Sequence, residues 1–280
     1  MRFGFVFNDP NGALRYDLYT YGFASKTLAD GLYAAVSGRI TLAEDVSKTV
    51  GTSNSVLPRV RSESVNYRRQ GRRAKLLSLH LTHLANPADR VYTRATAGIL
   101  EEMFAGAGGE VLYLPQAGNW AADFSAYGVR QRDFEGHFGF FDYETVTALA
   151  SFYYRVPSHG LTFTTRVGRF LAKDDGVRFE LKRRFLSGFE VGAWYSHTDA
   201  RDITSPGRPD NPYRDKGVFL RYAVGPFLPR DSNMSATIAI APWARDPGQM
   251  LHGQSRLYEM HERRLLLNLE DLGPWSDFGQ

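Results

Sequence analysis

Two polar residues of the 280-residue chain have the types and spacing of a hydrolytic pair. Ser78 and His80 are two positions apart, so they share a face of a β-strand, and a hydrolase acting on lipid or glycan would need such a serine beside a histidine. His83 is three positions from His80 and falls on the opposite face, which argues against a shared metal. Polar residues on a water-facing strand explain the pattern with fewer assumptions. We therefore keep a hydrolase as an alternative and expect no catalytic residue, metal ligand or cofactor.

Other sequence features also fall short of a catalytic motif. Glu101 and Glu102 are adjacent, so their carboxylates diverge on a strand and do not face one another as an acid/base pair. The glycine-rich stretch 106–109 is not followed by the Lys-Ser/Thr of a phosphate loop. The chain has no cysteine, which excludes disulfides, thiol catalysis and cysteine-bound metals. Chemistry of these kinds is not indicated.

Basic side chains form the most conspicuous polar pattern. One group alternates with apolar residues, which predicts that its members share the polar face of several strands: Arg94, Arg166, Arg178, Lys182, Arg184 and Arg221. A second group is crowded into a stretch without alternation and is expected in a loop: Arg59, Arg61, Arg68, Arg69, Arg72 and Arg73. The net charge is only +4, so a nucleic-acid partner is not favoured.

The elements that would position these residues are β-strands. Between Leu161 and Thr198, three apolar/polar alternations follow one another and are separated only by 173–176 and 187–188. This pattern predicts a meander of antiparallel hairpins. Similar alternation recurs around residues 32–42, 77–82, 91–100, 120–126, 146–154, 218–224 and 236–240. The glycines at 106, 108 and 109 indicate the tip of a further hairpin.

We predict an all-β fold, an antiparallel up-and-down transmembrane β-barrel of about 12–14 strands that need not be complete, with long loops on one rim. The predicted strands are about 10–12 residues long, more than the ~5–6 typical of soluble sheets. Short and long connections alternate. Aromatic residues gather near predicted strand ends, as in an interfacial girdle: Tyr16, Trp120, Tyr153, Tyr154, Tyr195 and Trp243. The barrel domain is expected over residues 1–256, with loops at about 44–75 and 199–215, and a helical or disordered tail over 257–280.

Alternation alone also fits a soluble β-sandwich that binds glycans. In a sandwich the apolar faces pack on each other and the charged face meets water, whereas in a barrel the charged face lines the lumen. No run approaches the ~18 apolar residues of a membrane helix.

Several longer motifs resemble the C-terminal part of the YjbH/GfcD family of outer-membrane exopolysaccharide and capsule biosynthesis proteins. The motifs are 93–106 (TRATAGILEEMFAG), 129–134 (VRQRDF), 141–146 (FDYETV), 167–174 (VGRFLAKD) and 215–218 (DKGV). The resemblance covers roughly residues 75–260. It implies an outer-membrane lipoprotein-like or β-barrel component of an exopolysaccharide secretion locus, without known catalytic residues. Full-length members resemble two barrels in one polypeptide, and no secretory signal precedes the strands here, so we expect the chain to be a fragment that supplies the second barrel.

Together these features predict a non-catalytic protein that assists export or surface assembly of an acidic exopolysaccharide. The six alternating basic residues would contact the polymer in the lumen. The arginine-rich loop would hold anionic headgroups or glycan at the rim. The expected partners are the acidic exopolysaccharide, the lipid bilayer, lipopolysaccharide and other proteins of the export locus, and the alternative is an outer-membrane hydrolase.

Overall fold

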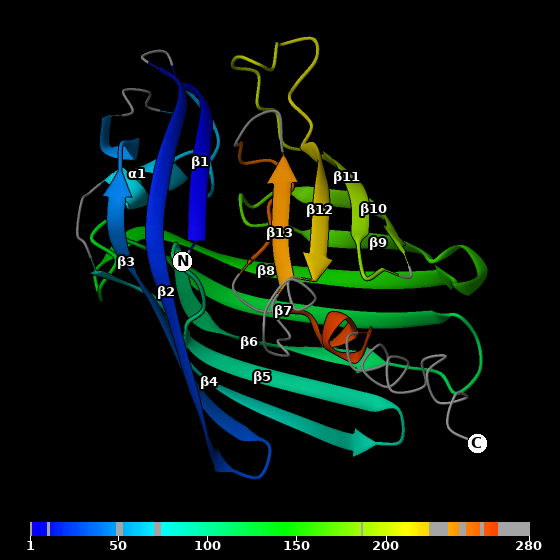
Figure 1. Ribbon diagram of the computed structural model, residues 1–280. Coiled ribbons are helices and arrows are strands. Elements are labelled where there is room, and N and C mark those ends of the chain that lie inside the picture. Colours follow the sequence, from blue (N-terminus) through cyan, green and yellow to red (C-terminus); the bar gives the residue numbers. More distant parts are fainter. Residues whose placement is uncertain are drawn as a thin grey trace.

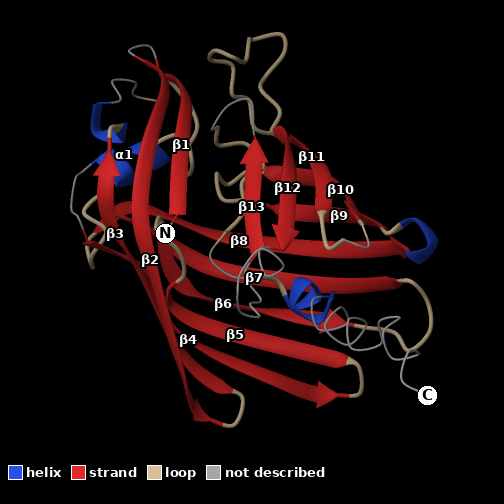
Figure 2. Ribbon diagram, in the orientation of Figure 1, coloured by secondary structure: helices blue, strands red, loops and turns tan. Residues whose placement is uncertain are grey.

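A computed structural model describes residues 2–9, 12–48, 53–69, 74–185, 187–223, 235–240, 245–252 and 255–262. Its main feature is one antiparallel sheet in which thirteen strands lie in sequence order, from β1 to β13 (Figures 1 and 2). The strands are β1 Arg2–Asp9, β2 Gly12–Ala29, β3 Leu32–Glu44, β4 Ala74–Ala88, β5 Val91–Ile99, β6 Phe104–Tyr113, β7 Trp120–Arg132, β8 Phe140–Val156, β9 Leu161–Arg169, β10 Asp175–Arg184, β11 Glu190–Thr198, β12 Lys216–Ala223 and β13 Ser235–Ile240. The all-β, up-and-down antiparallel prediction is confirmed.

Helical structure is short. It consists of the 3-10 turns η1 (Val46–Lys48) and η2 (Pro157–His159), the helix α1 (Ser64–Arg69) and a helical turn at residues 257–262. Among the described residues, no helix has the length and apolar character needed to cross a bilayer.

The predicted meander is present as β9, β10 and β11. Arg178 on β10 lies opposite Arg166 on β9 and Ser196 on β11, and Phe179 lies opposite Thr165 and Tyr195. Because directly opposed residues of an antiparallel pair point to the same face, this register gathers the charged side chains on one face and the apolar ones on the other.

The sheet curls strongly, so that β2 and β3 rise on one side and β10 to β12 on the other, with β5 to β8 between them (Figure 1). The pairing ends at β1 on one edge and at β13 on the other. Within the described ranges, these two edge strands are not paired with each other.

The β5–β6 hairpin turns earlier than its glycines indicated. The turn occupies residues 100–103, and Gly106 and Gly108 lie inside β6. A Cβ atom on Gly106 would lie 2.0 Å from the carbonyl oxygen of Gly128, and one on Gly108 would lie 2.2 Å from that of Ala126. These glycines therefore permit a close approach of β6 to β7, and the expectation that they form the tip is wrong.

Burial is inverted relative to a soluble sheet. On β9 the side chain of Arg166 is 3% exposed, whereas Phe163 is 46% exposed. We call the face that carries Arg166 the inner face and the face that carries Phe163 the outer face. Large apolar residues exposed on the outer face include Val36, Ile40, Leu79, Leu81, Val111, Phe124, Val146, Phe152, Val167, Phe179, Leu181 and Val218.

Two small apolar clusters lie on the inner face, toward opposite ends of β6. The first contains Phe104 and Val129 together with Val60 and Tyr67 from the segment 53–69. The second contains Leu112, Ala121 and Tyr153 together with Leu257 and Tyr258. Chain segments that return to the inner face therefore supply part of both clusters. We call 53–69, 245–252 and 255–262 the inner segments.

Candidate functional site: the inner face of the sheet

The basic residues predicted to line a lumen lie on the inner face, but each has a carboxylate partner. Arg178 Nη1 is 2.9 Å from Asp215 Oδ2, and Arg166 Nη1 is 3.2 Å from Glu180 Oε2. Glu190 forms ion pairs with both Arg184 and Arg221, whose Nη1 atoms lie 3.3 and 3.4 Å from its carboxylate oxygens. The other two pairs are Arg94 with Glu110 and Lys182 with Glu262.

This pairing removes most of the excess positive charge that the sequence pattern suggested. An unpaired charge in a buried setting costs several kcal/mol, whereas a close opposite charge offsets that cost. Glu180 and Glu190 share the alternation of the basic residues, so part of the pairing could be anticipated. Glu262 and Asp215 come from other segments, and no local signal in the sequence indicates them.

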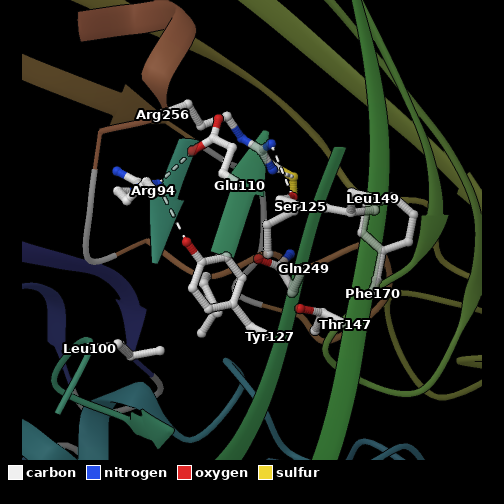
Figure 3. A pocket seen from close by; sticks show the side chains of 12 residues that line it. Arg94, Leu100, Glu110, Ser125, Tyr127, Thr147, Leu149, Phe170, Gln249 and Arg256 are labelled. Atoms are coloured by element: carbon white, nitrogen blue, oxygen red, sulfur yellow. Dashed lines mark hydrogen bonds and ion pairs between the residues drawn. The ribbon is translucent and has the colours of Figure 1, made fainter. Parts of the chain in front are cut away.

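Arg94 and Glu110 border a small cavity of about 50 Å³ on the inner face (Figure 3). Arg94 Nη2 donates to Glu110 Oε2 at 2.6 Å, and the backbone N–H of Leu257 donates to Glu110 Oε1 at 3.1 Å. Arg256 reaches from the same segment toward Asp123, at 3.5 Å. The inner segment 255–262 is therefore fixed to β5, β6 and β7 by charged groups.

The same segment packs through aromatic rings. Tyr258 stacks on Tyr153 with ring centroids 3.8 Å apart and an interplanar angle of 14°. Tyr153 is only 1% exposed, so it belongs to the inner face and the expectation that it forms part of an interfacial girdle is wrong. Tyr16, Trp120, Tyr154 and Tyr195 are exposed, and Trp243 lies outside the described residues.

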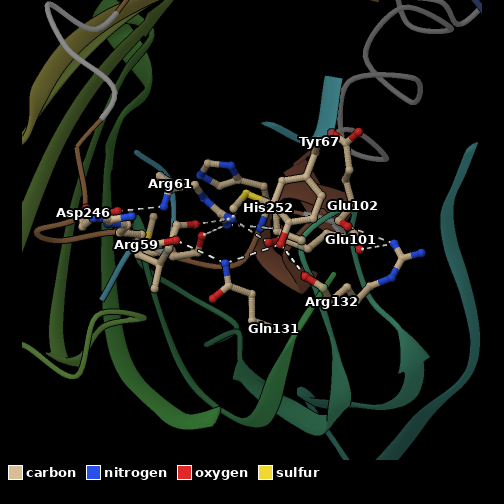
Figure 4. A network of polar contacts seen from close by, with 12 residues as sticks. Arg59, Arg61, Tyr67, Glu101, Glu102, Gln131, Arg132, Asp246 and His252 are labelled. Carbon is tan, nitrogen blue, oxygen red and sulfur yellow. Dashed lines mark hydrogen bonds and ion pairs between the residues drawn. The ribbon is translucent and has the colours of Figure 1, made fainter. Parts of the chain in front are cut away.

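A second polar network joins the inner segments 53–69 and 245–252 to the β5–β6 turn (Figure 4). Arg61 donates to both carboxylate oxygens of Glu101, at 2.7 and 3.1 Å. The backbone N–H of His252 donates to Glu101 Oε2 at 2.6 Å, and that of Arg61 donates to Asp246 Oδ1 at 2.8 Å. Glu101 is thus shared by two chain segments, and its role here is to hold them together.

Electrostatics also fix the protonation state at this junction. The positive charge of Arg61, together with desolvation, holds the pKa of His252 well below its usual value. The His252 imidazole is therefore neutral near pH 7.

Part of the arginine-rich loop packs against the inner face of the sheet. Arg61 is 8% exposed and belongs to the network just described. Arg59 is half exposed and pairs with Glu63 at 2.6 Å, while Arg68 borders a larger cavity. Arg69 ends α1, but its side chain is not described, and Arg72 and Arg73 lie outside the described residues.

Ser78 and His80 share the inner face, as their spacing predicts, but they are not hydrogen-bonded to each other. Ser78 Oγ pairs with Ser37 Oγ at 2.6 Å, and His80 Nδ1 pairs with Thr82 Oγ1 at 3.1 Å. A serine nucleophile would need the histidine within hydrogen-bond reach. Within the described ranges, no three His, Asp or Glu side chains gather as metal ligands would.

A larger cavity of about 750 Å³ lies on the inner face between β2–β4 and β10–β12, and the β5–β6 turn and the inner segments supply the rest of its lining. Four aromatic side chains line it: Tyr21 and Phe23 from β2, Trp194 from β11 and Phe219 from β12. Trp194 and Phe219 occupy positions at which the alternation of their strands otherwise places polar residues or glycine. Aromatic residues at such positions are the signal in the sequence that could have identified this cavity.

The fold and site define a class: an all-β protein with one curled antiparallel sheet, an apolar outer face and an ion-paired inner face. The chain belongs to the YjbH family, because the model of that family, described as exopolysaccharide biosynthesis protein YbjH, matches residues 2–263. It is also 32% identical over 265 residues to a protein of Escherichia coli strain K12 called uncharacterized lipoprotein YjbH. That match covers 91% of this chain and 37% of the relative, so the chain spans well under half of the relative's length. No solved structure matches the chain significantly.

Proposed function

We propose that the chain forms a transmembrane β-barrel wall in the outer membrane and assists export or surface assembly of an exopolysaccharide without catalysis. The observation that carries this proposal is the inverted burial of the sheet. Phe179 and Val167 are 50% and 53% exposed on the outer face, while Arg166 is 3% exposed on the inner face. The family supports a role in exopolysaccharide biosynthesis.

Lipid is the environment that best fits the outer face. Monomeric soluble proteins rarely expose contiguous apolar patches larger than a few hundred Å². Here the exposed aliphatic and aromatic residues continue from β3 through β12. A soluble β-sandwich would bury such residues between two sheets. Transmembrane barrels, in contrast, alternate apolar residues toward lipid with polar residues toward the lumen.

The inner face would contact the polymer. An arginine side chain has five N–H donors, and one ion pair leaves some of them unused. Of the six basic residues, Arg184 and Arg221 have the most accessible side chains, at 24% and 27% exposed. We propose Arg94, Arg166, Arg178, Lys182, Arg184 and Arg221 as contacts for an acidic polysaccharide. The exposed Arg59 is proposed to contact lipopolysaccharide or another protein of the export locus.

Fractionation and export assays test this function. The protein is expected in the outer-membrane fraction and is expected to migrate differently on gels before and after boiling, as folded barrels do. Deleting the gene should lower the amount of polysaccharide at the cell surface, and the intact gene should restore it. A water-soluble protein, or unchanged surface polysaccharide in the deletion strain, would contradict the proposal.

A further inference from the structure

We propose that the 750 Å³ cavity between β2–β4 and β10–β12 binds an uncharged pyranose residue of a glycan, stacked on the Trp194–Phe219 pair. This inference deepens the proposed function and rests on it, since it assigns a subsite to the polymer. The volume falls within the ~300–1,000 Å³ of small-molecule sites.

The aromatic pair is held rigidly. The Trp194 Nε1–H donates to Asp215 Oδ2 at 2.8 Å, and the Arg178 guanidinium carbon lies 5.1 Å from the centroid of the Trp194 ring. Trp194 and Phe219 lie at an interplanar angle of 27°, with ring centroids 6.5 Å apart. Two neighbouring rings therefore have similar orientations at the cavity, and Asp215 fixes one of them.

The backbone beneath the Phe219 ring is shaped to receive it. Residue 192, directly opposite Phe219 in the β11–β12 register, is glycine. A Cβ atom there would lie 2.3 Å from the ring atom Cζ of Phe219 and 2.9 Å from the carbonyl oxygen of Leu181. Gly192 thus provides the space in which the Phe219 ring lies, and any larger residue would displace the ring.

Aromatic rings also border the cavity from the opposite wall. Phe23 lies opposite Ser37 and Tyr21 opposite Arg39 in the β2–β3 register, so both face inward with those buried residues. Phe23 is nevertheless 62% exposed, because it faces the open space of the cavity. Four aromatic rings from two opposite parts of the sheet therefore border this one cavity.

The combination of rings and polar groups fits a sugar. A pyranose ring presents an apolar C–H face, which packs against a flat aromatic ring, and a rim of hydroxyl groups, which exchange hydrogen bonds with carboxylates and guanidinium groups. An acyl chain would meet too many ionised groups here, because burying these without compensation is costly.

The charge of the cavity favours an uncharged sugar residue. Five arginines and five carboxylates line it, so their formal charges cancel. Arg178 and Arg221, the two proposed polymer contacts that line the cavity, are paired with Asp215 and Glu190, so they would reach an uncharged residue of the polymer through their remaining N–H groups. Uncharged hydroxyl groups can share these donors and acceptors, whereas a uronic acid carboxylate would meet the five carboxylates as well.

The test uses the full chain in detergent micelles with Trp120, Trp243 and Trp275 replaced by phenylalanine, so that Trp194 is the only tryptophan. Uncharged hexasaccharides of glucose, galactose and mannose, and a hexamer of galacturonic acid, are titrated separately. We expect a saturable change in Trp194 emission with at least one uncharged hexamer. Phe219→Ala should weaken that binding by roughly three- to tenfold.

Gly192→Ala provides a second variant, which displaces the Phe219 ring while keeping it, and should also weaken binding. Phe163→Ala, on the outer face of β9, is the matched control and should bind as the parent does. Heat-modifiable migration confirms that each variant is folded. The inference is overturned if no uncharged hexamer gives a saturable change, if only the acidic hexamer binds, or if folded Phe219→Ala and Gly192→Ala bind as tightly as the parent.

Export in cells separates this inference from the proposed function. If the proposed function is wrong, deleting the gene leaves surface polysaccharide unchanged whatever the cavity binds. If only the inference is wrong, deletion lowers surface polysaccharide, and the Phe219→Ala gene restores it as fully as the parent gene does.

Discussion

Replacing Phe179 by arginine tests whether the outer face of the sheet contacts lipid. Phe179 is the fifth of the ten residues of β10 and is 50% exposed on the outer face. Ten residues at ~3.3 Å each give a strand of about 33 Å, and a tilt of ~40° reduces its height to about 25 Å, the thickness of the apolar band of outer-membrane barrels. Phe179 would therefore lie near the bilayer midplane.

An arginine at the midplane of a lipid-facing strand lowers the free energy of unfolding by about 2–4 kcal/mol, and the penalty falls to about 0–1 near the interface. In water, a half-exposed surface substitution changes it by no more than about 0.5 kcal/mol. Urea unfolding in phosphatidylcholine vesicles, followed by tryptophan fluorescence, measures the difference. Phe179→Ala serves as the reference, since it removes the same ring without adding charge.

Tyr154→Arg is the matched control. Tyr154 is 48% exposed on the outer face and lies two residues before the end of β8 at Val156, which places it near an interface. We expect the arginine penalty at position 179 to exceed that at 154 by at least about 1 kcal/mol. Equal penalties at the two positions, or full folding of Phe179→Arg without lipid or detergent, would refute the assignment of the outer face to lipid.

Two further predictions concern the inner face. Glu110→Gln leaves the buried Arg94 without its carboxylate and should lower the free energy of unfolding by roughly 3–5 kcal/mol, measured by the same urea unfolding; Asp142→Asn at the exposed Arg130 pair should cause no measurable change. The pKa of His252 is depressed in the fold, so below about pH 6.5 the unfolded chain binds more protons than the folded chain. The free energy of unfolding should therefore be highest, as far as His252 is concerned, above that pH and should fall as the solution is acidified. His252→Gln should reduce this loss in unfolding measurements between pH 7 and 5, and an unchanged pH profile would contradict the role of the imidazole.

The alternation in the sequence was sufficient to predict the sheet and its two faces. In β9 to β11 apolar and polar residues alternate regularly, and the strands begin and end close to the predicted turns. Arg166 and Phe163 lie on opposite faces as expected, because the side-chain period of a strand is two. The prediction of a hairpin tip at Gly106 was wrong, because the sequence around a glycine does not show whether it lies inside a strand or in a turn.

The contents of the inner face could not be predicted in the same way. Arg61 pairs with Glu101 across forty positions, and Lys182 pairs with Glu262 across eighty. Such pairs depend on where the inner segments lie against the sheet, and period-two alternation carries no information about that. Only Glu180 and Glu190 could be anticipated as partners from the alternation, although each of the six alternating basic residues has a carboxylate beside it.

The inner segments also limit where a polymer could pass. They are attached near both ends of β6, through Phe104 and Tyr67 at one end and through Leu112 and Tyr258 at the other. Paired charges fill much of the region between, and the cavity at Arg94 measures only about 50 Å³. The 750 Å³ cavity offers far more room, and its aromatic walls belong to the strands, not to the inner segments. A glycan bound there could therefore contact Trp194 and Phe219 while the ion pairs that hold the inner segments stay intact.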